Sequence, residues 1–298
     1  MNIWLFFIII GTCTSCTHRP PWFTSHKAEK SLSEKPFVII VPSYNNREWY
    51  EYNLSSVLLQ KYKNYRIIYI DDNSSDQTGC YVQAFIKKHK IKNITFIQNR
   101  QRVGALANIW HSIQLTTDHE IIINLDGDDW FSHDQVLKYL NKIYQSPNVW
   151  LTYGQFQNWP TKKNGWCKEI PQEIIAQNNF RSHGFCFAQP RTYYAWLAKK
   201  IKNEDLIDEQ TKTFYKVAGD VALMFPLVEM AGLHIKFINE ILCVRNVKNP
   251  LNDFKINLEE QLNITQLIAN QPSYKPLTNV REVANYDGTI MGSFPIST

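Results

Sequence analysis

Three carboxylates lie within four residues of this chain, at Asp126, Asp128 and Asp129. They follow the apolar run 120–125, which is typical of a buried strand. Carboxylates this close raise one another's pKa and cost stability unless a cation or hydrogen-bond donors neutralise them. Mg²⁺ and Mn²⁺ prefer oxygen ligands and commonly bind substrate phosphates as well. The stretch therefore predicts a divalent-cation site, with an ordinary Asp-Gly turn leading into a helix cap as the alternative.

Two further polar clusters follow apolar runs nearer the N-terminus. Residues 43–46 read Ser-Tyr-Asn-Asn after the run 37–41, and residues 71–76 read Asp-Asp-Asn-Ser-Ser-Asp after the run 66–70. In open parallel sheets, ligands bind beyond the carboxyl ends of the strands, where loops of neighbouring units meet. The sequence therefore predicts that both clusters share one edge of a sheet with the acids at 126–129.

Other metal and phosphate motifs do not fit these residues. An EF-hand loop that started at Asp72 would need Gly at its sixth position and Glu at its twelfth, where the chain has Gln77 and Gln83. The chain has no GxxxxGK[ST] loop, no GxGxxG turn and no HExxH helix, and its later cysteines lack metal-ligand spacing. A hard cation held by carboxylates remains the interpretation that the residues favour.

Alternating strand and helix patterns must position these loops. Runs of near-continuous apolar character predict buried strands over residues 37–41, 66–70, 94–98 and 120–125. Apolar residues at three- and four-residue steps predict helices over residues 49–59, 79–89 and 103–115. This regular alternation predicts an α/β fold with a mainly parallel, Rossmann-like sheet flanked by helices.

Three ordered motifs add a family resemblance. VPSYNN at 41–46, IDDNSSDQTG at 70–79 and LDGDDW at 125–130 resemble, in order and spacing, the nucleotide-sugar-binding half of family 2 glycosyltransferases. The resemblance covers residues 36–155 strongly and continues more weakly to about residue 245. It implies a GT-A fold with a smaller acceptor-side region. It also implies an enzyme that moves a sugar from a nucleoside-diphosphate sugar, with a UDP-sugar favoured, to a hydroxyl of a glycan, lipid or protein by inverting transfer.

The resemblance also assigns roles to residues on this rim. Pro42, Tyr44 and Asp72, with Asp71 as an alternative, are the implied contacts of the nucleotide base. An aromatic ring can stack on a base, and a carboxylate can accept its imide N–H, while a packed core aromatic is the other interpretation of the tyrosine.

The DxD element of the family falls on Asp126 and Asp128. It implies that this element holds the ribose of the donor nucleotide, to which Asp126 is assigned as a contact, and a divalent cation, Mn²⁺ or Mg²⁺. We place the cation on Asp128, with Asp126 and Asp129 as alternative ligands. One departure concerns the Arg-Asn pair that family members show before this element, because here Ala107 precedes Asn108. Arg100 or Arg102 could supply the missing cation to the phosphates, with a solvated loop as the alternative.

The second half of the chain offers a general base. Asp220 opens a helical pattern after Gly219, as the catalytic acid of the family does, and a first-turn Asp that interacts with the helix dipole is the alternative. Pro226 should kink this helix or mark its true start. His183 and Arg191 are weaker candidates for contacts with the acceptor or the donor phosphates.

The chain divides into five expected segments. They are a signal-peptide-like or lipoprotein-like leader or anchor at 1–17, a linker at 18–35, a nucleotide-sugar-binding half at 36–155, an acceptor-side half at 156–245 and a C-terminal helical or irregular extension at 246–298. The extension contains one expected helix, over 252–268, and no motif.

The leader and the charge bear on location and partners. The leader is apolar at 3–10 but has no preceding Lys or Arg, so export or membrane association is favoured and a cytoplasmic position stays open. The 32 basic and 27 acidic residues are spread along the chain, which argues against a nucleic-acid partner. The leader also keeps a second function open, a non-catalytic exported or anchored protein that binds nucleotides or sugars on the same fold.

Overall fold

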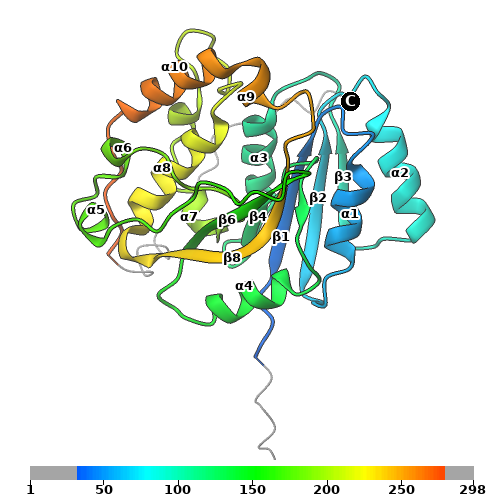
Figure 1. Ribbon diagram of the computed structural model, residues 1–298, viewed down its shortest axis with the longest axis horizontal. Helices are drawn as coiled ribbons and strands as arrows, with labels where there is room; N and C mark the ends of the chain where they lie inside the picture. Colours follow the sequence, from blue (N-terminus) through cyan, green and yellow to red (C-terminus); the bar gives the residue numbers. More distant parts are fainter. Residues whose placement is uncertain (1–31, 279–298) are drawn as a thin grey trace, which may run out of the picture. The chain divides into compact units, whose positions relative to one another are not determined.

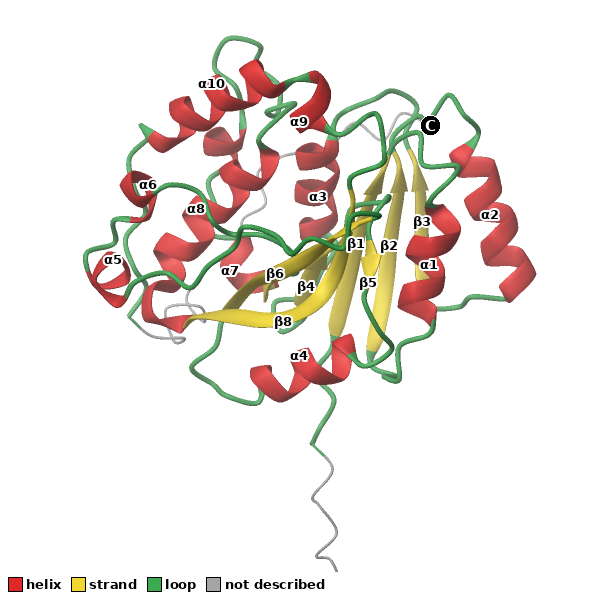
Figure 2. Cartoon of the chain, viewed as in Figure 1, coloured by secondary structure: helices red, strands yellow, loops and turns green. Residues whose placement is uncertain are grey.

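One mixed β-sheet organises the described part of the chain, which is residues 32–278 of a computed structural model (Figures 1 and 2). The expected leader at 1–17 and most of the expected linker lie outside the described residues. The strands are β1 (Phe37–Ser43), β2 (Tyr65–Asp71), β3 (Ile94–Gln98), β4 (Ile121–Asn124), β5 (Trp130–Phe131), β6 (Leu151–Trp159), β7 (Arg191–Tyr194) and β8 (Ile235–Asn246). Their order across the sheet is β3-β2-β1-β4-β7-β6-β8-β5.

The donor-side half of the sheet is parallel, as the sequence predicts. β1 pairs in parallel with β2 and with β4, and β2 pairs in parallel with β3. Every residue of β1 and β4 is buried, which explains why these strands are continuously apolar rather than alternating. Ser43 lies opposite Asp71 in the register, so the loops that follow β1 and β2 leave the sheet at the same level.

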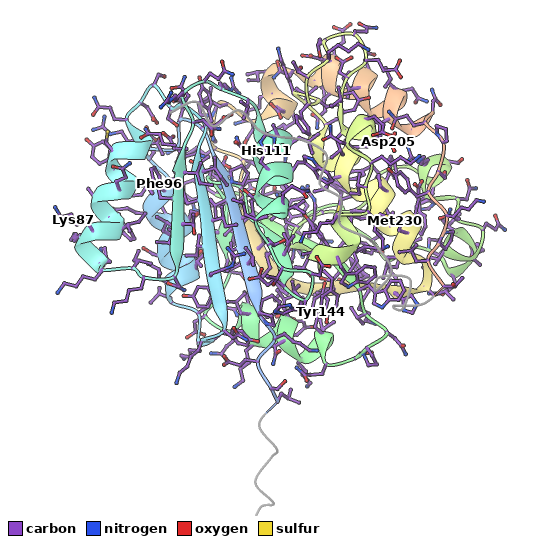
Figure 3. The ribbon with its side chains drawn as sticks, turned by 180° about the vertical axis from the view of Figure 1, so that it is seen from behind. Lys87, Phe96, His111, Tyr144, Asp205 and Met230 are labelled. Atoms are coloured by element: carbon purple, nitrogen blue, oxygen red, sulfur yellow. The ribbon has the colours of Figure 1, made fainter. Side chains whose placement is uncertain are left out.

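Helices cover both faces of this half. α1 (Tyr50–Leu58) crosses the face seen in Figure 1, and α3 (Ala105–Gln114), which carries His111, crosses the opposite face, seen in Figure 3. The remaining helices are α2 (Thr78–His89), α4 (Val136–Tyr144), α5 (Gln172–Ala176), α6 (Phe180–His183), α7 (Ala195–Ala198), α8 (Gly219–Ala231), α9 (Asp253–Ile256) and α10 (Leu258–Ala269), with two 3₁₀ helices, η1 (Asn203–Leu206) and η2 (Gly232–His234). Within residues 32–278, no helix combines the length and the apolar character needed to cross a bilayer.

Antiparallel pairing appears where the chain enters its second half. β7 pairs antiparallel with β4 and with β6, while β6 and β8 run parallel, with a register shift around Gly154 and Gln155. The short strand β5 pairs antiparallel with β8 at the other end of the sheet. The sheet is therefore mainly parallel but mixed.

The helix α8 forms the core of the second half. It starts at Gly219, where the sequence places Asp220 in a first turn, so Pro226 lies inside the helix and does not mark its start. A buried ion pair anchors it, because the Arg181 guanidinium of α6 contacts the Glu229 carboxylate at 2.5 and 3.0 Å. The same guanidinium donates to the Ile268 carbonyl of α10 at 2.6 Å. This pair joins α6, α8 and α10.

The expected helix over 252–268 is wrong as a single element. The structure divides it into α9 and α10 at Asn257, whose φ of −131° is not helical. The Asn257 side chain donates to the Asp253 carboxylate at 3.4 Å. Lys255 donates to the carbonyls of Val247 and Asn249, which holds α9 against the loop after β8.

Candidate functional site

The turn that carries the three acids packs directly on the end of β1. The backbone N–H of Gly127 donates to the Pro42 carbonyl at 3.0 Å. A Cβ at Gly127 would lie 2.6 Å from Asn46 Nδ2 and 2.8 Å from Ser43 Oγ, so only glycine allows this close approach. The structure thus brings two of the predicted polar clusters together.

The third cluster, after β2, joins the same rim. Asn45, held at a φ of 52°, accepts the Ser75 backbone N–H on its Oδ1 at 2.9 Å. The Asn46 backbone N–H donates to the Thr78 hydroxyl at 2.9 Å. Tyr44, half-buried, lies between these two anchored residues and β1. The expectation that the three polar loops share one edge of the sheet is confirmed by these contacts.

The two acids at the end of β2 differ in their hydrogen-bond partners. Asp72 accepts the backbone N–H groups of Val103 and Gly104 at 3.0 and 2.9 Å, and Asn99 Nδ2 at 2.8 Å. Asp71 is fully buried under Gly79, its Oδ2 accepts Gln98 Nε2, and its Oδ1 has no hydrogen-bond partner among the described residues. Of the two, Asp72 shapes the loop at the rim.

Neutral donors hold the acids that follow β4. Gln189 Nε2 donates to Asp126 Oδ2 at 2.6 Å, and Asn249 Nδ2 donates to Asp128 Oδ2 at 2.8 Å. The Asn246 backbone N–H donates to Asp129 Oδ1 at 2.8 Å. None of these donors carries a charge, so the acids are oriented without being neutralised.

Burial shifts the titration of all three acids upward. It raises the pKa of Asp128 to about 6, with a further contribution from the Asp126 charge. Burial also raises the pKa of Asp126 and holds that of Asp129 well above its ordinary value. A cation would favour the ionised forms over the protonated ones.

The carboxylate oxygens of this turn suit a hard divalent cation. Residues 32–278 contain no group of three His, Cys, Asp or Glu side chains arranged to hold a metal by themselves. A cation bound by one or two carboxylates and by the phosphates of a ligand needs no such group, and this is the usual arrangement for Mg²⁺. The donor set therefore fits a cation that arrives with a phosphate-bearing ligand.

Asp220 reaches the same rim from α8. Its Oδ2 accepts Arg191 Nη2 at 2.9 Å, and its Oδ1 accepts the Val221 backbone N–H at 3.0 Å. Arg191 is fixed in turn by a bond from its Nε to the Phe187 carbonyl. The Arg191 charge lowers the pKa of Asp126 and the Asp220 charge raises it, so both groups act on the acidic turn.

His183 lies elsewhere. It is exposed at the end of α6, which is on the far side of α8 from α3 (Figure 1). The structure therefore brings Asp220 and Arg191 to the acids but not His183.

The C-terminal segment supplies residues that sequence reasoning missed. Asn246 and Asn249 bond to the acids. Burial raises the pKa of Asp253 of α9, and the Asp126 and Asp220 charges add to that rise. Arg245 acts on the same acids, and its charge opposes the rise in pKa of Asp128. The only local signal was a run of amides, Asn-Val-Lys-Asn-Pro-Leu-Asn, after a strand.

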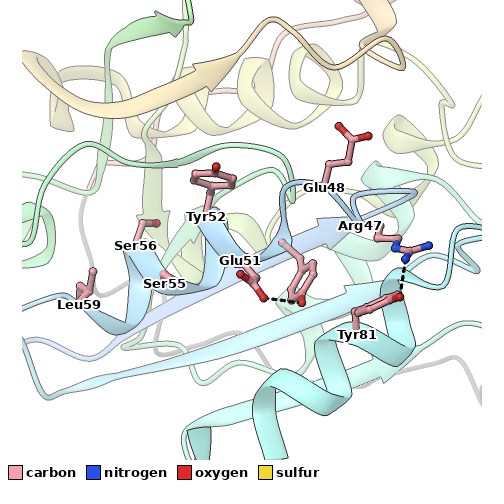
Figure 4. Close-up of a pocket in the computed structure, with 9 residues that line it drawn as sticks. Arg47, Glu48, Glu51, Tyr52, Ser55, Ser56, Leu59 and Tyr81 are labelled. Carbon is pink, nitrogen blue, oxygen red and sulfur yellow. Dashed lines mark hydrogen bonds between the residues drawn. The ribbon is translucent and has the colours of Figure 1, made fainter. Parts of the chain in front are cut away.

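A cavity of about 620 Å³ lies on the outer side of α1 (Figure 4). It is lined by Arg47, Glu48, Tyr50, Glu51, Tyr52, Ser55, Ser56, Leu59 and Tyr81. Figure 4 shows Arg47 bonded to the Tyr81 hydroxyl. The Tyr50 hydroxyl donates to Glu51 Oε1 at 3.0 Å. None of the predicted site residues is among those that line this cavity.

Comparison with known proteins identifies a family match. The model described as glycosyl transferase family 2 matches residues 38–197, more than half of the chain. A poly(ribitol-phosphate) beta-N-acetylglucosaminyltransferase of Staphylococcus aureus is 27% identical over 75% of this chain and 67% of its own. A UDP-Glc:alpha-D-GlcNAc-diphosphoundecaprenol beta-1,3-glucosyltransferase of Escherichia coli is 30% identical over 54% of this chain and 68% of its own.

Solved structures show the same fold. S. aureus TarS in complex with UDP-GlcNAc superposes with a TM-score of 0.58 at 17% identity, over 78% of this chain and 65% of that one. The mannosyltransferase PcManGT from Pyrobaculum calidifontis, in complex with GDP-Man and Mn²⁺, gives a TM-score of 0.55 at 18% identity, over 81% and 66%. The chain spans about half to two thirds of the length of the first proteins it matches. The predicted GT-A architecture is confirmed.

Proposed function

Because the chain belongs to glycosyl transferase family 2, we propose that it transfers a sugar from a UDP-sugar to an acceptor hydroxyl with inversion, using a divalent cation. One observation carries the proposal. Asp126 and Asp128, whose pKa values are raised, share a rim with Tyr44 and with the Arg191–Asp220 ion pair. A base-binding ring, a cation site and a general base are the parts that this reaction needs.

The donor nucleotide would lie over the loops after β1 and β2. The Tyr44 ring stacks on the base, and Pro42 and Asp72 border it, with Asp71 buried behind. Asp126 takes the ribose. Asp128 holds the cation, with Asp126 and Asp129 as the alternative ligands. The cation, when bound, neutralises the negative charge that develops on the departing diphosphate.

Asp220 would act on the acceptor. Its carboxylate takes the proton from the acceptor hydroxyl as the oxygen attacks the anomeric carbon on the face opposite the diphosphate. Arg191 donates to one oxygen of the Asp220 carboxylate, and this bond holds the carboxylate in an orientation that leaves its remaining lone pairs for the acceptor. His183 remains a candidate for an acceptor contact, but a weak one, because its side chain is exposed and does not lie beside the acids.

The relatives suggest the chemistry of donor and acceptor. The printed names of two curated relatives describe one enzyme that uses UDP-Glc with a diphosphoundecaprenol-linked sugar and one that acts on poly(ribitol-phosphate). For this chain we therefore propose a UDP-sugar donor and an acceptor hydroxyl on a glycan, lipid or protein. Residues 36–155 form the donor half in this proposal and 156–245 the acceptor half. The extension from 246 completes the rim, and membrane association through the leader stays a prediction.

Thermal shift with a nucleotide panel tests the proposal. UDP with Mn²⁺ or Mg²⁺ should raise the melting temperature of the chain, and Asp128→Asn should abolish the shift because it removes the charge that binds the cation. Asp134→Asn is the matched control, since the Asp134 carboxylate lies at the surface, where it pairs with Lys61 and accepts a hydrogen bond from Gln135. A chain that responds to no nucleotide diphosphate would overturn the proposal.

Turnover separates the enzyme from the alternative. We expect slow hydrolysis of one UDP-sugar in the absence of acceptor, measured as release of UDP. Tight UDP binding without hydrolysis or transfer of any sugar would instead support the non-catalytic binding protein on the same fold.

A further inference from the structure

A continuous surface lies at the end of the sheet opposite the acidic rim, where the parallel strands begin. Asn93, in the loop before β3, donates its Nδ2 to the Tyr65 carbonyl at the start of β2, at 3.1 Å. The Lys35 backbone N–H, just before β1, donates to Asn141 Oδ1 of α4 at 3.0 Å, and α4 lies where the chain enters β1 (Figure 1). The segments that lead into β1, β2 and β3 therefore share this end of the sheet with α4.

Lysines from three parts of the chain gather on this surface. Seven of them are exposed and form no ion pair within residues 32–278, and they define the basic face: Lys63, Lys87, Lys88, Lys90, Lys92, Lys138 and Lys142. Three carboxylates at the same end are already paired with other cations, in the ion pairs Lys61–Asp134, Arg66–Glu120 and Lys199–Asp118. A fourth, that of Glu34, accepts the backbone N–H groups of Lys63 and Asn64 at 3.1 and 2.9 Å. The basic face therefore keeps a large excess of positive charge.

Exposed apolar side chains lie at the same end of the sheet. Leu59, which ends α1, is 69% exposed, and Leu115, which ends α3, is 57% exposed. The Leu115 carbonyl accepts Arg66 Nη2 at 3.1 Å, which places it beside the start of β2. Tyr139 of α4 is 39% exposed. Single exposed apolar residues are ordinary, but leucine and tyrosine next to lysines are typical of surfaces that enter the headgroup region of a membrane.

We propose that the basic face docks the folded domain on a membrane surface that contains anionic lipids. The negative potential of such a surface attracts lysines, while leucine and tyrosine side chains enter the boundary between headgroups and acyl chains. The chain enters β1 from this face, and the apolar run at 3–10 precedes that point in the sequence, so a leader held in a membrane would tether the domain by this face.

The inference does not rest on the proposed function. The acidic rim lies at the other end of β1, a strand of 7 residues and thus about 20 Å long. A lipid bound at the basic face is therefore a docking partner and not the acceptor. The lysines alone would suit a nucleic acid equally well. Leu59 and Leu115 favour the lipid surface, because a phosphate backbone offers no apolar partner for them.

Co-sedimentation of the full chain with vesicles tests the proposal. The wild type should bind vesicles of phosphatidylcholine mixed with phosphatidylglycerol more tightly than vesicles of phosphatidylcholine alone. Binding should weaken as the salt concentration rises from about 0.1 M to about 1 M, because the Debye length falls from about 10 Å to about 3 Å. The variant with Lys88→Gln, Lys90→Gln and Lys92→Gln should bind about 30- to 100-fold more weakly, since each lysine near an anionic surface contributes about fivefold.

The matched control removes the same charge from exposed lysines elsewhere, with Lys162→Gln, Lys163→Gln and Lys212→Gln. Residues 162 and 163 follow β6 at its rim end, where β6 pairs with Asn246, the residue that donates to Asp129. Lys212 lies between η1 and α8, in a segment tied to the end of α10 by the bond from Gln271 to Tyr215. The control should bind the mixed vesicles within about threefold of the wild type. Unchanged melting temperatures show that both variants are folded.

A leucine variant separates a membrane from a nucleic acid. Leu59→Gln with Leu115→Gln should weaken binding to the mixed vesicles about 5- to 20-fold, because these side chains would no longer leave water on docking. Tighter binding of the wild type to a DNA duplex than to the mixed vesicles, with no effect of the leucine changes, would assign the face to a nucleic acid and overturn the proposal.

Three further outcomes would also overturn it. Equal vesicle binding by the wild type and the lysine variant would show that the face does not dock. An equal loss in the control variant would show that only net charge matters. Equal binding of the wild type to phosphatidylcholine alone would show that the leader acts without the face. Each of these outcomes leaves the proposed transfer reaction standing, because UDP binding tests that reaction separately.

Discussion

Different features of the structure control the orientation of the Asp128 carboxylate and the cost of ionising it. Asn249 fixes its carboxylate through a neutral amide, and burial together with the Asp126 charge makes ionisation costly. In the proposed function, a cation bound to this carboxylate would remove that cost.

The titration of Asp128 should be visible in the stability of the ligand-free protein. Its pKa is about 6 in the folded state against an ordinary value of 3.8. Between about pH 4 and about pH 6, the folded protein therefore binds a proton at Asp128 that the unfolded chain has released. The free energy of unfolding falls as pH rises through this window. Asp128→Asn lacks this proton, so it should gain stability relative to the wild type from about pH 4 to about pH 6. Urea denaturation in EDTA at each pH measures the difference.

A flat difference across that range would contradict the assignment of the raised pKa to Asp128. Glu120 titrates with the opposite sign, because contacts with Arg66 and Thr117 outweigh its burial and lower its pKa. Since both proteins contain Glu120, its contribution cancels.

Asp220→Asn tests the proposed base. The amide keeps the shape of the side chain but cannot take a proton, so transfer should slow about 10²- to 10⁴-fold. UDP binding should be retained, because the proposal assigns Asp220 to the acceptor and not to the nucleotide. Steady-state transfer rates and calorimetry measure the two effects, and a loss of UDP affinity with normal turnover would show that the residue serves the donor.

At the scale of single residues, the sequence predicted the candidate site residues that lie at the ends of strands. Pro42, Tyr44, Asp72 and Asp128 come from local motifs at strand ends, and parallel topology brings those ends together. Asn249 could not be found in this way. It contacts Asp128, which lies 121 residues away in the sequence, and no local pattern encodes a contact between residues so far apart.

At the scale of elements, the turn after β4 depends on a glycine. Gly127→Ala would bring its Cβ to 2.6 Å from Asn46 and 2.8 Å from Ser43, so the loops after β1 and β4 must separate. We expect a loss of about 1–3 kcal/mol in the free energy of unfolding and a clear loss of UDP affinity. Urea denaturation and calorimetry measure the two effects.

Gly184→Ala is the matched control for that substitution. Its φ of +95° strains an alanine, but no atom lies within 4 Å of the added Cβ. This variant should lose stability without losing UDP affinity. Equal UDP affinity of Gly127→Ala and the wild type would show that the spacing of the two loops is irrelevant to the nucleotide.

The buried pair of Arg181 and Glu229 holds the elements of the second half together. Removing either partner leaves a buried charge without its counter-ion, which should cost about 3–5 kcal/mol in the free energy of unfolding. The double variant Arg181→Met with Glu229→Gln should cost less than the sum of the single changes. A double-mutant cycle in urea measures the coupling, and additive costs would show that the two side chains act independently.

Element boundaries show where sequence patterns stop being sufficient. The strand and helix patterns of the first half predict β1 to β4 and α1 to α3 because burial there follows the period of each element. The pattern over 252–268 is helical too, yet Asn257 and the contacts of Lys255 divide it. Those contacts are tertiary, and periodicity does not report them.

At the scale of the molecule, the acidic rim is assembled from both ends of the described chain. β1 provides the loop with Tyr44, β4 leads to the acids, α8 contributes Asp220, and the segment after β8 returns with Asn246 and Asn249. The order of motifs in the sequence predicted the first three contributions. It gave no sign that the C-terminal extension closes the rim.

The bond from Asn249 to Asp128 has a consequence for how the protein is made. A ribosome delivers the acids more than a hundred residues before the amide that orients Asp128. A nascent chain can therefore complete the parallel strands β1 to β4 before the amide that orients Asp128 exists. In the proposed function, competence to hold the cation and its ligand would then be acquired only after the segment that follows β8 has been made.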